Sequence, residues 1–163
     1  MNPTLERIQR GRILLLLDEP FFGSLLMHLK PVVNERIPTF STDGKSLHIN
    51  PAFCEQLNDR QLKTILAHEV MHCALLHPYR RGQRDHRQFN IAADYAINNF
   101  LDAYNQHATK RHEAAPFTFD GPLVGGCLNH AYDGLCAEEI YNLLPKGGGG
   151  GGVGQGNGSS GGA

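Results

Sequence analysis

The stretch AHEVMHCALLH, Ala67–His77, places three histidines and a glutamate inside an otherwise apolar run. Helical spacing of about 100° per residue gathers the apolar side chains around it into one stripe, which predicts a core helix. His68 and His72 lie one turn apart on an adjoining face, whereas Glu69 falls on the apolar stripe. A buried carboxylate is costly without a charged partner, so this helix needs one. The stripe consists of Leu62, Ile65, Leu66, Cys73 and Leu76.

Residues 68–72 form the pattern H-E-x-x-H. Two histidines four residues apart can bind one metal ion, and in zinc peptidases the glutamate between them acts as a general base. A chance match is the alternative, and the buried position of Glu69 argues against it. We therefore expect His68 and His72 to bind Zn²⁺, one ion per chain, with Glu69 as the catalytic base.

The next segment, Phe89–Leu101, is apolar nearly all round, which predicts a second buried helix that contains Asp94. Two histidines from one helix and a carboxylate from the next would leave a fourth position for water, so we expect Asp94 to be the third ligand. An aspartate that caps a helix or joins a core network is the alternative. Asn90 and Asn98 lie one turn from Asp94. They could orient Asp94 or a histidine, or equally satisfy backbone groups.

His77 is the obvious further candidate, but it lies nine residues after His68, about 180° around the same helix. It could reach the metal only if the helix ended before it. We expect the helix to end near His77 and Pro78, where a histidine interacts favourably with the helix dipole.

The remaining segments predict an α+β fold with a small edge β-hairpin beside the H-E-x-x-H helix. Asp43-Gly44 separates two short alternating runs, which is typical of a hairpin turn. Pro38 favours an edge position for the first strand, Thr39–Thr42, which could hold an extended peptide or form a solvated edge. Asn58 or Asp59 is expected to cap the H-E-x-x-H helix. Other helices are expected over residues 3–17, 21–33, 51–57, 87–104 and 137–144.

The formal net charge of −1 over 163 residues gives no global field that would attract nucleic acid or an anionic membrane. The four cysteines form no C-x-x-C pair, so they indicate neither a disulfide framework nor a zinc knuckle. The apolar run Ile13–Leu17 is too short to span a bilayer. We expect a cytoplasmic protein with a folded domain over residues 1–146 and a disordered glycine-rich linker over 147–163.

Several segments together resemble the metallopeptidase domain that precedes a von Willebrand factor A-like domain in bacterial predicted metal-dependent peptidases. They are PFFGSLL, TFSTDGKSLHINPAF, LAHEVMHCALLHPYRRG, FNIAADYAIN and GLCAEEIYNLLP. The helix pair is also similar to gluzincin-type zincins, in which a glutamate on the second helix is the third ligand. The resemblance implies a zincin-like fold, metal ligation by His68, His72 and Asp94, and Glu69 as base.

These observations favour a zinc-dependent peptidase acting on a peptide or protein substrate. The resemblance also implies a downstream von Willebrand A-like domain or an AAA-type ATPase as a partner. The alternative is a catalytically weak or inactive metal-binding scaffold that works with such an ATPase or domain. A glutamate at position 69 favours the enzyme, because a purely structural zinc site needs no base and fills its fourth position.

Overall fold

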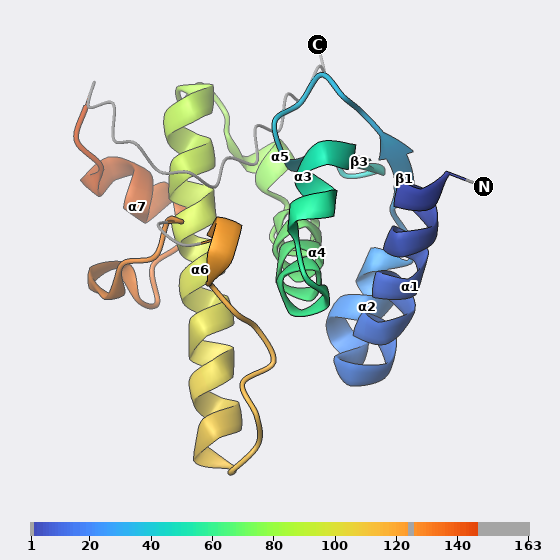
Figure 1. Cartoon of the computed structure of the whole chain (residues 1–163). Helices are drawn as coiled ribbons and strands as arrows, with labels where there is room; N and C mark the ends of the chain where they lie inside the picture. Colours follow the sequence, from blue (N-terminus) through green and yellow to red (C-terminus); the bar gives the residue numbers. More distant parts are fainter. Residues whose placement is uncertain (1, 124–125, 147–163) are drawn as a thin grey trace.

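Helix α4 (Asp59–Ala74) lies at the centre of the fold, between the α1–α2 pair on one side and α6 on the other (Figure 1). The computed structural model describes residues 2–123 and 126–146. The helices are α1 (Pro3–Asp18), α2 (Pro20–Leu26), α3 (Pro51–Gln56), α4, α5 (His77–Arg80), α6 (His86–Lys110) and α7 (Ala137–Leu143). The strands are β1 (Lys30–Val33), β2 (Phe40–Thr42) and β3 (Ser46–Ile49), and two 3₁₀ turns lie at Gly121–Leu123 and His130–Tyr132. The predicted α+β class is confirmed.

The start of α4 is fixed by reciprocal hydrogen bonds of Asn58, one of the two residues expected from the sequence to cap this helix. Its Oδ1 accepts from the backbone N–H of Gln61 at 2.9 Å, and the Gln61 side chain accepts from the N–H of Asn58 at 2.8 Å. This capping box satisfies two backbone donors that the first turn would leave unpaired. The helix ends at Ala74, earlier than expected, because Leu76 adopts a left-handed conformation with φ of 57°.

The core forms where α4 packs against α1 and α2. Leu62 and Leu66 of α4 are almost fully buried, together with the apolar faces of the two N-terminal helices. The crossing of α1 and α2 depends on Gly23, because a Cβ atom there would lie 2.2 Å from Cα of Leu16. Leu57, which precedes α4, belongs to the same cluster.

The sheet has the strand order β1-β3-β2. The predicted hairpin is confirmed: β2 pairs antiparallel with β3, and Asp43 Oδ1 accepts from the N–H groups of Lys45 and Ser46 in the turn. The helix expected over residues 21–33 is wrong beyond Leu26. Residues 30–33 form β1, parallel to β3, because Pro31 breaks a helix and the valines after it favour a strand.

Strand β2 lies at the edge of the sheet, as predicted, but Phe40, Ser41 and Thr42 are all buried. Thr42 Oγ1 also contacts Sγ of Cys73 on α4 at 3.4 Å.

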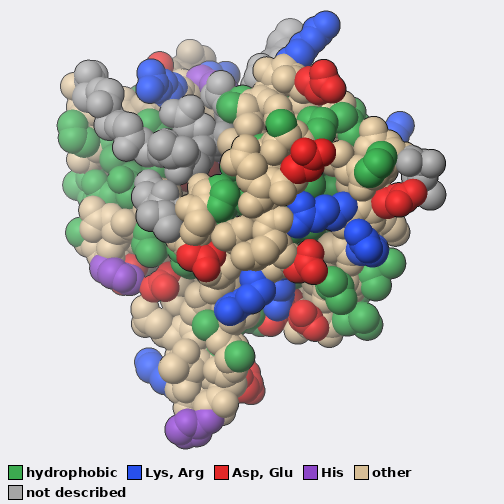
Figure 2. All heavy atoms as spheres, viewed as in Figure 1, with side chains coloured by type: hydrophobic (Ala, Val, Ile, Leu, Met, Phe, Trp, Pro, Cys, Tyr) green, Lys and Arg blue, Asp and Glu red, His purple; other side chains and the backbone are tan. Residues whose placement is uncertain are grey.

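Helix α6 runs six residues beyond the predicted end and packs on α7 (Figure 1). The Arg80 guanidinium pairs with the carboxylate of Glu138 on α7, with Nε 2.8 Å from Oε1. Acidic and basic side chains are interspersed on the face shown in Figure 2. No helix in the described ranges is long and apolar enough to cross a membrane. The linker predicted over residues 147–163 lies outside the described residues.

Candidate metal centre

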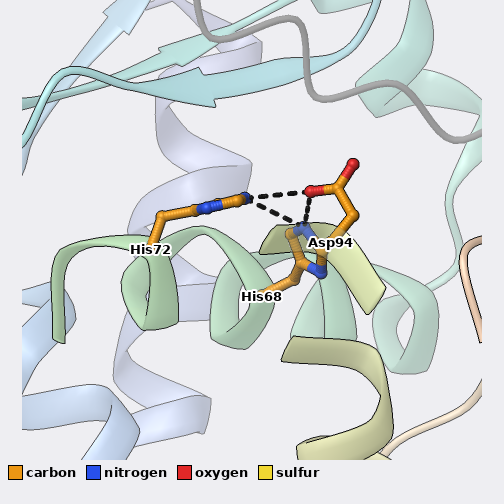
Figure 3. A group of neighbouring side chains, drawn as sticks. All are labelled: His68, His72 and Asp94. Atoms are coloured by element: carbon orange, nitrogen blue, oxygen red, sulfur yellow. Dashed lines mark hydrogen bonds and ion pairs between the residues drawn. The ribbon is translucent and has the colours of Figure 1, made fainter. Parts of the chain in front are cut away.

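Three side chains from two helices converge between α4 and α6: His68 and His72 come from α4 and Asp94 comes from α6 (Figure 3). Nε2 of His68 lies 3.2 Å from Nε2 of His72, and each of these atoms lies 3.2 Å from Oδ1 of Asp94. Three potential donor atoms thus form a nearly equilateral triangle. The structure brings together the three residues that the sequence proposed as ligands.

The dimensions of this triangle fit a small divalent cation. A tetrahedral zinc ion with bonds of about 2.0–2.1 Å keeps its ligand atoms about 3.3–3.4 Å apart, close to the separations found here. Two imidazole nitrogens and one carboxylate oxygen are also ligands that zinc accepts. The cluster therefore has the chemistry and the spacing of a metal site with three protein ligands.

Asn98 sets the orientation and proton position of His68. Its Nδ2 donates to the carbonyl of Cys127 at 3.0 Å, which turns Oδ1 toward Nδ1 of His68 at 2.8 Å. An amide oxygen only accepts, so Nδ1 of His68 carries a proton, and once Nε2 loses its own proton the Nε2 lone pair faces the triangle. Asn98 thus takes the orienting position considered from the sequence. Asn90, the other residue considered for this role, makes no hydrogen bond to the cluster within residues 2–123 and 126–146.

His68 and Asp94 form a coupled pair in the metal-free protein. Burial alone would lower the pKa of His68, but the hydrogen bond and negative charge of Asp94 outweigh it and raise this pKa to about 9. Burial in turn would raise the pKa of Asp94, but the two histidines hold it below its usual range. Metal-free His68 is therefore positively charged at neutral pH, with a proton on each ring nitrogen. A bound metal ion would have to displace the proton on Nε2.

Glu69 lies beside the cluster but is not one of its three donors. Its side chain is buried on α4, and burial raises the pKa of its carboxyl group, an effect that the nearby histidines partly offset. A carboxylate with a raised pKa next to a metal site is suited to accept and return a proton.

A small cavity lies beside Glu69 and His68, which are both among its lining residues. It has a volume of about 40 Å³ for the centres of water molecules, enough for about three of them. Its walls are mostly apolar, with Thr39, Thr64 and Asn98 as further polar members. The apolar side chains that line it belong to Phe40, Phe53, Ile65, Phe119 and Leu123.

The expectation that His77 lies at the end of α4 and interacts with the dipole of that helix is wrong. Since α4 stops at Ala74, His77 begins α5, and only 4% of it is exposed. Its Nδ1 lies 3.2 Å from Nδ1 of His72. Burial, and then the charges of His72 and Arg80, lower the pKa of His77 to about 3. No sequence signal marked this contact, because Leu76 is not a residue that usually adopts a left-handed conformation.

Fold and site together define an α+β domain with an H-E-x-x-H helix and a cluster able to bind a metal ion. Residues 4–162 match the family model described as "Putative metallopeptidase domain", and the chain belongs to that family. Membership implies a metal ion, and His68, His72 and Asp94 are a suitable site for it. No curated protein and no solved structure matches the chain.

Proposed function

We propose that the protein is a zinc-dependent peptidase with a zincin-like arrangement of its two central helices. The observation that carries the proposal is the triangle of Nε2, Nε2 and Oδ1 atoms, each 3.2 Å from the others, with a buried glutamate next to it in the chain. Three protein ligands leave one coordination position for water or substrate, which is typical of catalytic zinc sites. Family membership supports the same class of reaction.

The ion, when bound, would supply Lewis-acid chemistry, lowering the pKa of a water molecule and polarising a peptide carbonyl. His68 and Asp94 contribute their lone pairs from opposite helices, and Asn98 holds His68 in the required tautomer. Glu69 accepts the proton of the attacking water at its carboxylate. It then returns the proton to the amine nitrogen as the peptide bond breaks, so that the base is regenerated.

The cavity beside Glu69 supports a preference for an aliphatic side chain next to the cleaved bond. Three water molecules occupy about 90 Å³ of liquid, which is space for a branched aliphatic group. Binding of an apolar side chain between these walls would gain about 25 cal/mol of free energy for each Å² of apolar surface removed from water. We place recognition of a substrate side chain in this cavity.

Metal content and peptide cleavage test the proposal together. Wild-type protein should contain about one zinc ion per chain, and Asp94→Ala should lose most of it, because one of three ligands is gone. Glu69→Gln should retain the zinc and lose cleavage of a peptide library that wild type digests. Asp102→Ala, on the same helix as Asp94, is the matched control for Asp94→Ala, and the exposed Glu55→Gln is the matched control for Glu69→Gln. Both controls should bind zinc and cleave peptides as wild type does.

Each possible result has a defined reading. Equal cleavage by wild type and Glu69→Gln would remove the proposed base. Zinc in wild type with no cleavage of any peptide would favour the metal-binding scaffold. A wild type that binds no zinc would contradict the site itself.

A further inference from the structure

His77 reaches the metal centre through a break in the chain between α4 and α5. Leu76 has φ of 57° and ψ of 28°, and 56% of it is exposed. A left-handed conformation costs a residue with a side chain roughly 1 kcal/mol, and exposed Leu76 gains little packing in return. The break turns His77 back toward α4, where a continuous helix would have carried it to the other side.

The position of His77 is fixed from several sides. Its ring packs edge-on against Phe89 of α6, with ring centroids 6.2 Å apart. Arg80, one turn later, donates from Nη1 to the carbonyl of Leu75 at 2.8 Å and pairs with Glu138 of α7. Helix α5 is therefore attached both to the end of α4 and to α7, which holds the imidazole of His77 in place.

We propose that His77 is a positioning residue that accepts a hydrogen bond from Nδ1 of His72 and so directs the Nε2 lone pair of His72 at the metal ion. The inference rests on the proposed metal site. Each of the two metal-binding histidines would then have a buried partner at its Nδ1 atom, Asn98 for His68 and His77 for His72. Such partners fix the tautomer and the ring orientation of a ligand.

The contact also excludes His77 as a fourth ligand in this geometry. His77 faces Nδ1 of His72, whereas the ligand triangle is formed by Nε2. When His77 accepts at Nδ1, its own proton is on Nε2, a buried atom with no hydrogen-bond partner in the described part of the chain. An unpaired buried donor is unfavourable, so its presence beside the ligand His72 fits a role in the site better than a role in stability.

Three substitutions separate hydrogen bonding from packing. His77→Phe retains a ring of similar size and removes the acceptor. His77→Asn places an amide oxygen where Nδ1 stands, whereas His77→Gln places it near the position of Nε2. We expect His77→Phe and His77→Gln to weaken zinc binding about 10- to 100-fold and His77→Asn to remain within about threefold of wild type.

Zinc affinity is measured by competition with a chromophoric chelator, after thermal unfolding of the metal-free proteins has shown which variants fold. In ¹⁵N-labelled, zinc-loaded protein, NMR should show a protonated Nδ1 on His72 in wild type and in His77→Asn. If His77→Phe does not fold, His77→Asn and His77→Gln still decide the question.

Equal affinity of the folded variants and wild type would overturn the inference, as would an unprotonated Nδ1 on His72 in zinc-loaded wild type. Equal weakening of His77→Asn and His77→Gln would also overturn it, since only packing would then matter. A wild type that binds no zinc would instead refute the metal site of the proposed function.

Discussion

Replacement of Asn98 by alanine tests whether the proton position of His68 controls metal binding. Asn98 makes two contacts, one to Nδ1 of His68 at 2.8 Å and one to the carbonyl of Cys127 at 3.0 Å. With zinc on Nε2, the Nδ1 proton of His68 cannot move, so Asn98→Ala leaves a buried donor unpaired. The metal-free ring can relieve this penalty by losing its Nδ1 proton and keeping the Nε2 proton, which faces Asp94. The cost therefore appears mainly as lost affinity.

The size of the loss follows from the energy of one buried hydrogen bond. An unpaired buried donor costs about 1–3 kcal/mol, and 1.4 kcal/mol corresponds to a tenfold change in an equilibrium constant. We therefore expect the zinc dissociation constant of Asn98→Ala to rise about 10- to 100-fold, the range usual for loss of a partner of a metal-binding histidine. Competition with a chromophoric chelator at pH 7.5 measures this change.

The neighbouring Asn99 provides the matched control. Asn99 is also buried and also attaches α6 to the following loop, through the backbone of Asn129 and the carboxylate of Asp133. Asn99→Ala should lower stability at least as much as Asn98→Ala, yet keep zinc affinity within about threefold of wild type. The reasoning is refuted if Asn98→Ala binds zinc as wild type does, or if both variants lose affinity equally.

Two further predictions concern pH and the helix crossing. With the pKa of metal-free His68 near 9, zinc must displace one proton, so its affinity should rise about tenfold per unit between pH 7 and 9 and level off above; a pH-independent affinity in chelator titrations would contradict this. The same raised pKa of His68 stabilises the metal-free fold. This contribution is complete at pH values below the pKa of His68 in the unfolded chain, about 6.5, and is lost as the pH rises through 9. Gly23→Ala should cost about 3 kcal/mol in urea unfolding, because its Cβ would meet backbone. Gly11→Ala, whose Cβ would meet only flexible leucine ends at 3.1 Å, should cost far less, and equal losses would refute the steric argument.

The parts of the fold that depend on local signals were predictable from the sequence. Asn58 with Gln61 marks the start of α4, Asp43-Gly44 marks the hairpin, and the apolar period marks the buried helices. The spacing of the histidines and the lone carboxylate in the next apolar helix also singled out the three residues that the structure brings together.

The missed features depend on contacts that are distant in sequence or on an unusual backbone conformation. Strand β1 forms by parallel pairing with β3, a register that no local pattern specifies. The early end of α4 follows from a left-handed leucine, Leu76, at a position where a glycine would have signalled the break. The burial of His77 follows from that break, so both errors have one cause.

The spacing of four residues occurs twice in the metal centre, between His68 and His72 on α4 and between Asp94 and Asn98 on α6. Each pair keeps its relative position only while its helix stays in register. One residue inserted or deleted inside either interval would rotate one member by about 100° away from the other. Related sequences that retain the site should therefore vary in length only outside these two short intervals, and freely between α5 and α6.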